Sequence, residues 1–156
     1  MKLLVLSDSH GHDENLTDII LSHPDAGAVI FLGDGEWDLD NALLACGIRE
    51  EERIVCRVRG NCDRASLEPE TIVREFGGVR FLITHGHEQN VKYGLWGLVD
   101  EAKKRNCKAA LFGHTHRKTF LIREGVTLIN PGSAAGGSYC LLEAENGIVK
   151  EPARQE

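Results

Sequence analysis

Short apolar blocks alternate with polar stretches along this chain. Five of the blocks are rich in β-branched residues and have the length of strands, so they predict β-structure. Their nearly continuous hydrophobicity is typical of central strands that are covered on both faces. The five predicted strands are residues 2–7, 28–32, 53–59, 79–84 and 109–112.

Helical spacing of apolar residues appears between these strands. A first apolar stripe follows Asp13, which we expect to cap a helix. A second helical segment ends at Gly47, a residue type that is common just after helices. A third segment has apolar residues at helical spacing from 91 to 102, ahead of a Lys-Lys-Arg run that favours a helix C-terminus.

The rest of the chain has the pattern of β-hairpins. Residues 71–84, 119–129 and 138–150 each contain two strand-like runs joined by a turn with glycine. The chain thus begins with alternating strands and helices and ends with antiparallel strands. This mixture predicts an α/β fold in which two packed mixed sheets are flanked by helices. Because 156 residues suit one domain with a sizeable core, we expect a single domain over residues 1–156.

The chain is acidic, with a formal net charge of −6 from 18 basic and 24 acidic side chains. Non-specific affinity for nucleic acid comes from Lys and Arg, so general nucleic-acid binding is not expected. A substrate with a phosphate group would need a local source of positive charge. Two divalent cations would supply that charge and concentrate it at one place.

The five cysteines form no C-x-x-C pair, and their odd number argues against a disulfide framework or a thiolate zinc site. Reduced thiols are the simplest interpretation. The first residues lack the long apolar core and the cleavage site of a signal peptide, and no later run approaches the length of a membrane span. We therefore expect a cytoplasmic protein without membrane contact.

Six of the seven histidines occur in His-x-His pairs. Neutral imidazole is a common metal ligand, so this clustering points to metal binding, with ordinary core or loop histidines as the alternative. The pairs are His10 with His12, His85 with His87, and His114 with His116.

Polar residues follow all five predicted strands. The carboxyl ends of strands in an open α/β sheet form the ligand crevice, so we expect these side chains to converge. If they did not converge, five unrelated loops would each carry Asp, Asn or His beside glycine by coincidence. In chain order the residues are Asp8, His10, Asp34, Asn61, His85, His114 and His116.

Five short motifs contain these residues: DSH at 8–10, GD at 33–34, GNCD at 60–63, HGH at 85–87 and GHTH at 113–116. In this order they resemble the D-x-H, G-D, G-N-H-[DE], H and G-H-x-H motifs of the calcineurin-like metallophosphoesterases. The resemblance runs from Asp8 to about Ser133 and is strongest to the small YfcE-like phosphodiesterases. It implies a four-layer αββα sandwich, in agreement with the predicted fold.

The resemblance also implies a ligand set for two metal ions. Oxygen and nitrogen donors of this kind suit Mn²⁺, Zn²⁺, Ni²⁺ or Fe²⁺ better than Mg²⁺ or Ca²⁺, and we expect Mn²⁺. Two such ions, about 3.5–4 Å apart, share a hydroxide that attacks phosphorus in line. One ion would be held by Asp8, His10 and His116, the other by Asn61, His85 and His114, with Asp34 as the bridge.

The chain departs from the family pattern at Cys62, where the motif has histidine. A histidine would stabilise transition-state charge or protonate the leaving oxygen, whereas a thiol is a weak donor. We therefore expect activated esters or diesters to be favoured over ordinary monoesters, unless Cys62 only fills space. Asp63 is expected to orient its neighbours. The candidate catalytic residues are Asn61, Cys62 and Asp63.

Other polar residues near the motifs have open roles. His12, His87 and Arg64 are candidates for phosphate contact, with ordinary loop positions as the alternative. Ser133, in the glycine-rich segment 130–138, is at most a supporting residue. The two tryptophans lie either at an exposed rim or in the core.

Together these features predict a dimetal phosphoesterase with an open site and no cap domain, and among phosphoesterases a phosphodiesterase for a small substrate. One alternative is a phosphomonoesterase or phosphoprotein phosphatase, which the absence of histidine at position 62 disfavours. A second alternative is a non-catalytic scaffold that resembles the small retromer subunit, which shares this fold. Antiparallel edge strands leave a homodimer open as well.

Overall fold

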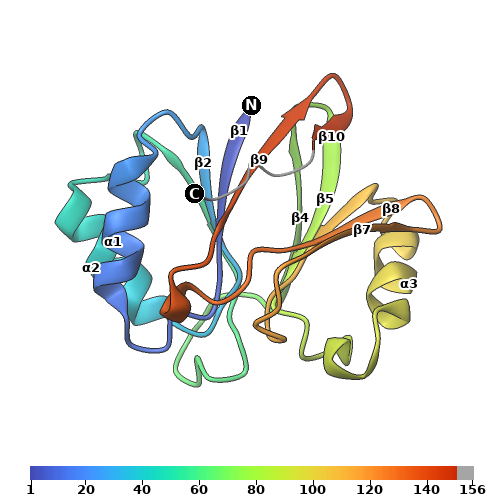
Figure 1. Cartoon of the computed structure of the whole chain (residues 1–156), viewed down its shortest axis with the longest axis horizontal. Coiled ribbons are helices and arrows are strands. Elements are labelled where there is room, and N and C mark those ends of the chain that lie inside the picture. Colours follow the sequence, from blue (N-terminus) through green and yellow to red (C-terminus); the bar gives the residue numbers. More distant parts are fainter. Residues whose placement is uncertain (151–156) are drawn as a thin grey trace.

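Two five-stranded sheets pack face to face at the centre of the computed structural model, which describes residues 1–150 (Figure 1). The strand order is β10-β9-β1-β2-β3 in sheet A and β4-β5-β6-β8-β7 in sheet B. Sheet A contains β1 (Lys2–Leu6), β2 (Ala28–Phe31), β3 (Ile54–Arg57), β9 (Cys140–Glu145) and β10 (Ile148–Lys150). Sheet B contains β4 (Thr71–Phe76), β5 (Val79–Thr84), β6 (Ala109–Leu111), β7 (Thr119–Arg123) and β8 (Val126–Asn130).

Helices cover the outer faces of both sheets. Sheet A is covered by α1 (Asp13–Ser22) and α2 (Glu36–Cys46), and sheet B by α3 (Trp96–Lys104). Two 3₁₀ turns, η1 (Val91–Tyr93) and η2 (Ala134–Gly136), lie in the connecting loops. The predicted four-layer α/β sandwich with mixed sheets is confirmed.

The predicted hairpins form where two consecutive residues adopt positive φ angles. Gly77 and Gly78 have φ of 59° and 77° in the turn between β4 and β5. Asn146 and Gly147 have φ of 53° and 77° between β9 and β10. Such turns match the right-handed twist of the flanking strands, which explains why these dipeptides predict hairpins correctly.

Two helix boundaries differ from the prediction. The segment 91–102 does not form one helix, because the chain turns at Gly94, with φ of 144°, and α3 begins at Trp96. The isolated turn η1 remains on the N-terminal side of this break. Asp13 is the first residue of α1 and not its cap, since the N-cap is His12, whose side chain makes no capping hydrogen bond.

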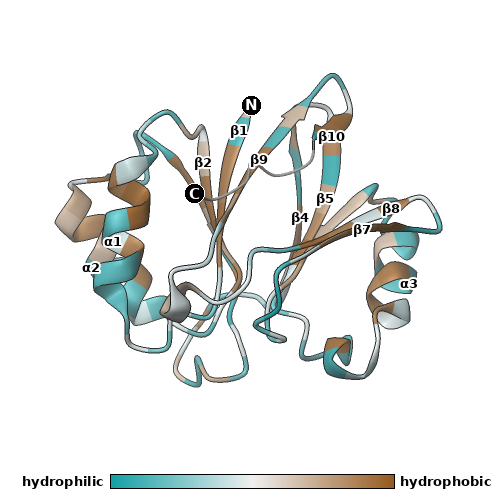
Figure 2. Cartoon of the chain, in the orientation of Figure 1, coloured by the Kyte–Doolittle hydropathy of each residue, from teal (hydrophilic) through white to brown (hydrophobic). Residues whose placement is uncertain are grey.

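The core consists of one apolar layer between the sheets and one under the helices on each side. Val5, Ile30, Phe81 and Leu111 belong to the central layer and are fully buried. Figure 2 shows the same concentration of hydrophobic residues along the strands. Each such side chain contributes about 1.5–3 kcal/mol through burial, so the strands are rigid supports for the loops that follow them.

The parallel strands of both sheets end on the same side of the molecule, the lower side in Figure 1. They are β1, β2 and β3 in sheet A and β5, β6 and β8 in sheet B. Their loops therefore meet at one edge of the sandwich. Within residues 1–150, no helix has the length and apolar character needed to cross a membrane.

Candidate metal centre

Three buried side chains form the floor of the site. Asp8 follows β1, Asp34 follows β2 and His85 follows β5, with relative exposures of 0, 3 and 0%. The His85 Nε2 atom lies 3.3 Å from Asp34 Oδ2 and 3.9 Å from Asp8 Oδ1. On the other side of the ring, His85 Nδ1 donates to the carbonyl of Leu32 at 2.7 Å. This hydrogen bond fixes the ring so that Nε2 faces the carboxylates.

Three further histidines form the rim above this floor. His116 Nε2 lies 3.2 Å from Asp8 Oδ1 and 3.3 Å from His10 Nε2, and His10 Nε2 also lies 3.8 Å from Asp34 Oδ2. His114 Nδ1 lies 3.2 Å from His85 Nε2. The donors thus gather in two groups, Asp8 with His10 and His116, and Asp34 with His85 and His114. These two groups contain six of the seven ligands that the resemblance implied for two ions. The seventh, Asn61, is exposed and is not part of either group.

The residues fit divalent cations. The Oδ1 atom of Asp8 is buried and has no hydrogen-bond partner within the described part of the chain. An unpaired carboxylate oxygen in the interior is costly, and a bound cation would satisfy it. Imidazole nitrogens of three histidines surround this oxygen at 3.2, 3.5 and 3.9 Å. Mixed carboxylate and imidazole donors suit transition-metal ions and zinc.

The electrostatics of the floor favour the charged form of Asp34. Burial alone would raise the pKa of Asp34, but the hydrogen bond and charge of His85 and the backbone N–H of Cys62 lower it below its usual range. Burial alone would lower the pKa of His85, but the hydrogen bond and charge of Asp34 and the charge of Asp8 raise it above its usual value. Burial and the charge of His85 lower the pKa of His114 to about 4, so its ring is neutral at pH 7. An ionised Asp34 and a neutral His114 are in the states that bind metal, whereas a metal ion at His85 Nε2 would have to displace a proton.

Left-handed backbone places most of these donors. Residues with side chains rarely adopt positive φ, although Asp, Asn and His do so more readily than most. Such residues cluster at functional sites, where surrounding contacts hold the strained backbone. Five of the seven predicted ligands have this conformation: Asp8, His10, Asp34, His114 and His116.

Glycines let the strand-end loops approach one another closely. A Cβ atom on Gly60 would lie 2.1 Å from Asp34 Oδ1, and one on Gly33 would lie 2.5 Å from the backbone nitrogen of Gly60. A Cβ atom on Gly113 would lie 2.7 Å from Asp8 Oδ2. The glycine in the GD, GNCD and GHTH motifs is therefore needed for space beside the ligands.

In the GNCD motif, Asp63 positions the neighbouring loops, while Asn61 and Cys62 lie at the edge of the site. The Asp63 carboxylate accepts backbone N–H groups of Asp34, Gly35, Glu36 and Gly60 at 2.7–3.2 Å, which ties the loops after β2 and β3 together. This is the orienting role expected for Asp63. The two exposed residues are Asn61 and Cys62, and the backbone N–H of Cys62 donates to Asp34 Oδ1 at 2.8 Å.

Several supporting residues have no clear signal in the sequence. Asp38, buried in α2, accepts hydrogen bonds from Ser9 Oγ at 2.6 Å and from the backbone N–H of Gly11 at 2.8 Å, so it holds the loop that carries His10. Ser7 Oγ donates to Asp8 Oδ2 at 2.5 Å. A helix residue that reaches back to a distant loop has no local spacing pattern, which explains why these contacts are not predictable.

The glycine-rich segment 130–138 packs behind the floor. Ser133 Oγ donates to the backbone carbonyl of Asp8 at 2.7 Å, and Asn130 Nδ2 donates to the carbonyl of Gly113 at 3.1 Å. The backbone N–H of Ala134 donates to the carbonyl of Ser7 at 2.8 Å. This segment therefore supports the ligand loops and does not form a phosphate cradle.

Two of the histidines with open roles lie outside the two donor groups. His12 is exposed and its Nδ1 lies 3.5 Å from Glu14. His87 packs beside His85, with ring centroids 5.4 Å apart, and its Nε2 lies 3.6 Å from Glu70. His87, Glu70 and Glu88 form a further group whose donor atoms lie within 4.8 Å of one another.

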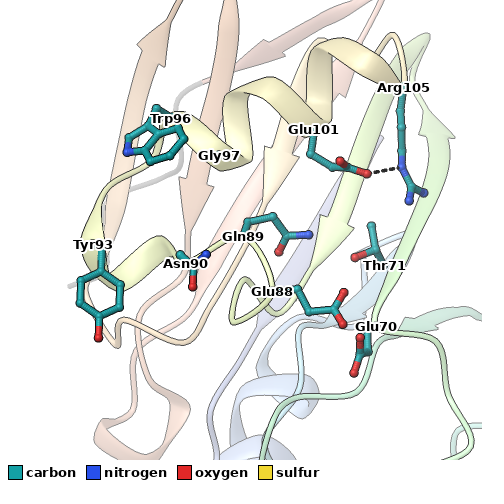
Figure 3. A pocket seen from close by; sticks show the side chains of 10 residues that line it. All are labelled: Glu70, Thr71, Glu88, Gln89, Asn90, Tyr93, Trp96, Gly97, Glu101 and Arg105. Atoms are coloured by element: carbon teal, nitrogen blue, oxygen red, sulfur yellow. Dashed lines mark hydrogen bonds and ion pairs between the residues drawn. The ribbon is translucent and has the colours of Figure 1, made fainter.

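Glu70 and Glu88 also line a pocket of about 510 Å³ beside α3 (Figure 3). Trp96 and Tyr93 lie at the other end of this pocket, and Glu101 accepts a hydrogen bond from Arg105 at 2.8 Å. The pocket contains none of the seven predicted ligands. Trp96 is 70% exposed and Trp37 is 78% exposed, so both tryptophans are surface residues.

The fold and the donor set define a metal-binding α/β protein with its site at the carboxyl ends of the strands. The family comparison is more specific, because the model of the calcineurin-like phosphoesterase superfamily domain matches residues 1–147. The chain belongs to this superfamily, as its motifs predict, and its curated relatives agree with the small YfcE-like group. Divalent metal ions are therefore expected cofactors.

Individual relatives are similar over most of the chain. The probable metallophosphoesterase YsnB of Bacillus subtilis is 31% identical over 153 residues, which cover 94% of this chain and 86% of the relative. The phosphodiesterase MJ0936 of Methanocaldococcus jannaschii is 27% identical over 153 residues, covering 87% and 86%. Among solved structures, Vps29 of Entamoeba histolytica complexed with zinc has a TM-score of 0.74 at 22% identity, covering 98% of both chains. The last similarity concerns the fold alone.

Proposed function

We propose that this protein is a dimetal phosphodiesterase that acts on a small substrate. The observation that carries the proposal is the convergence of two donor groups around the unpaired, buried Oδ1 atom of Asp8. A charged carboxylate in this position has a physical explanation when cations are bound. The name of the relative MJ0936, a phosphodiesterase, supports the choice of diester.

The chain's own residues suggest how the site works. When bound, two divalent cations, for which we propose Mn²⁺, supply positive charge for phosphoryl oxygens and lower the pKa of a water molecule. Asp8, His10 and His116 would hold one ion, and Asp34, His85 and His114 the other. From the family resemblance we propose that Asn61 joins the second group and that Asp34 is shared by both ions. Because no side chain needs to act as nucleophile, the protein's contribution is to position the ions and the substrate for the reaction.

Cys62 supports the preference for diesters. Its side chain is exposed at the edge of the site, and partial burial and the charge of Asp34 raise its pKa above the usual value for a thiol. The thiol therefore keeps its proton at pH 7, and a thiol is a weak hydrogen-bond donor. Substrates whose leaving group needs no strong acid should be favoured. Cys62→His should then increase the rate of hydrolysis of esters with poor leaving groups more than that of esters with good ones. An unchanged substrate profile would contradict this role.

The first test is hydrolysis of a chromogenic phosphodiester and the matching monoester. Metal-stripped protein should show no activity, protein reloaded with Mn²⁺ should hydrolyse the diester faster than the monoester, and Asp34→Asn should abolish both activities. Faster monoester hydrolysis would favour the phosphomonoesterase alternative. Metal binding without turnover of either ester would refute the proposal.

The alternative outside enzymes is a scaffold. The likeness in fold to Vps29 fits a scaffold that resembles the small retromer subunit. We favour the enzyme because six of the seven proposed ligands gather in two donor groups in this chain. The cytoplasmic location, the single domain, the absence of general nucleic-acid or membrane binding and the homodimer stay predictions from sequence.

A further inference from the structure

A second pocket adjoins the metal centre. It has a volume of about 660 Å³ and lies between the first turn of α2 and the loop of residues 62–68. This volume is within the range of about 300–1,000 Å³ that is typical of small-molecule sites. We call it the Trp37 pocket, and its lining includes Trp37, Leu67, Arg64, Cys62, Glu36 and Glu68.

The pocket adjoins the metal centre at Cys62. The Cys62 thiol lines the pocket and also lies within 4.8 Å of donor atoms of His10 and Asp34. Asp63, which ties the loops after β2 and β3 together, lines the same pocket. One ester group of a phosphate held at the metal centre therefore has the Trp37 pocket as its neighbour.

Two large apolar side chains in the pocket are exposed to solvent. Trp37 is 78% exposed, and Leu67 is fully exposed, with a relative accessibility of 101%. Neither side chain contributes to a core layer of the fold. Their apolar surface beside a polar centre is typical of a ligand site.

The backbone around these side chains is well anchored. Trp37 follows Glu36, whose N–H donates to Asp63 Oδ1 at 3.2 Å at the start of α2. On the opposite wall, the backbone N–H of Ser66 donates to the Asp63 carbonyl at 3.1 Å, and the N–H of Glu68 donates to Ser66 Oγ at 3.0 Å. Asp63 thus anchors both walls, so the indole ring projects from a defined position.

The charges of the lining restrict the ligand. The lining has four carboxylates, those of Glu36, Asp40, Asp63 and Glu68, against one guanidinium, that of Arg64. The Asp63 carboxylate already accepts backbone hydrogen bonds. Asp40 is already paired with Arg57 at 2.6 Å. A second phosphate would be repelled by the remaining carboxylates, whereas a neutral ring with N–H donors on its edge would be complementary to them. The charges of the lining therefore favour an occupant that is uncharged and able to donate hydrogen bonds.

We propose that the Trp37 pocket binds the nucleobase of a nucleoside phosphodiester, with the base stacked on the indole of Trp37. Base stacking on an aromatic side chain tolerates all four bases, so the pocket selects nucleoside esters as a class. This inference rests on the proposed phosphodiesterase function, because it names the substrate class of that site. Trp96, on the pocket of Figure 3, provides a matched control.

The kinetic test compares two diesters with the same leaving group, thymidine 5′-(p-nitrophenyl phosphate) and methyl p-nitrophenyl phosphate. The wild-type protein should have the higher kcat/KM for the thymidine ester. Trp37→Ala should lower the ratio of the two kcat/KM values about tenfold or more, since one stacked base is lost. Trp37→Phe should retain most of the ratio, and Trp96→Ala should leave it unchanged. A ratio that Trp37→Ala does not change would overturn the inference, as would an equal loss with both esters.

A binding test separates failure of this inference from failure of the proposed function. Trp96→Phe leaves Trp37 as the only tryptophan, so its fluorescence reports on the pocket. With Zn²⁺-loaded protein, adenosine 5′-monophosphate should quench this fluorescence and bind about tenfold more tightly than ribose 5-phosphate. Equal affinities without quenching would overturn the pocket assignment even if diesters are hydrolysed. Quenching without any turnover would retain the nucleotide pocket and refute the phosphodiesterase.

Discussion

The floor and the rim of the metal centre are built in different ways. The floor, Asp8, Asp34 and His85, is almost completely buried, and every member is held by hydrogen bonds to the protein. In the rim, the side chains of His10 and His116 are 36 and 48% exposed. The floor is therefore part of the fold, whereas the rim is part of the surface. Changes to the floor should affect stability and metal binding, and changes to the rim should affect metal binding alone.

The largest effect should come from Gly60→Ala, which forces a methyl group against the floor. The new Cβ would lie 2.1 Å from Asp34 Oδ1, so Asp34 or the loop must move. Urea denaturation should show a loss of about 3 kcal/mol, as overpacking does in other proteins, together with loss of metal binding. Gly136→Ala is the control, because its Cβ meets nothing within 4 Å. Equal stability of the two variants would show that the floor is not tightly packed.

Metal removal should have the next largest effect. A cation that binds only the folded protein at a hundred times its dissociation constant stabilises by about 2.7 kcal/mol. Chelation should therefore lower the thermal midpoint of the wild-type protein by several degrees. In Asp34→Asn the same treatment should cause a much smaller shift, because a floor ligand is missing. An identical shift in both proteins would place the bound metal elsewhere.

A pair of histidine variants tests the comparison directly. In metal-free protein, His85→Ala should cost about 2 kcal/mol, because it leaves the Leu32 carbonyl without its donor inside the protein. His116→Ala should change the free energy of unfolding by less than about 0.5 kcal/mol, since its side chain is 48% exposed. Both should weaken metal binding, as calorimetric titration would measure. Equal costs in stability would contradict the distinction between floor and rim.

The smallest effect on stability should come from modification of Cys62. Its thiol is exposed, whereas Cys56, Cys107 and Cys140 are buried, and burial raises the pKa of Cys140 to about 12. A disulfide reagent such as DTNB should react first with Cys62, more slowly than with free cysteine because the Cys62 pKa is also raised. Bound Zn²⁺ and phosphate should slow the reaction. If Cys62→Ser leaves the fast phase intact, another thiol is more accessible.

The sequence predicts the elements of the fold well where one local pattern dominates. The five predicted strands and the Gly-Gly and Asn-Gly hairpins form as expected. The prediction that all five strands are central and covered on both faces is wrong for β3, which lies at the edge of sheet A with Ile54 exposed. The helix predicted over 91–102 is wrong at its start, since one glycine with φ of 144° outweighs a continuing apolar pattern. Local spacing cannot reveal which conformation a glycine adopts.

For the site, the positions of polar residues after the predicted strands indicate which ligands converge. They do not indicate which other residues hold those ligands in place. The two donor groups contain every ligand expected from the motifs except Asn61. Asp38 and Asn130, which support His10 and His114 through their neighbours, act across the fold. The Trp37 pocket likewise depends on how α2 and the loop after β3 face each other. Contacts of this kind come from packing, so they require the structure.

The left-handed backbone of five ligands has a consequence for how this protein changes over evolutionary time. Each such residue costs the fold on the order of 1 kcal/mol, which glycine at the same position would not. A lineage that stopped using the site would gain stability by replacing these residues with glycine. At Asp8, His10, Asp34, His114 and His116, metal binding and fold stability therefore favour different residue types.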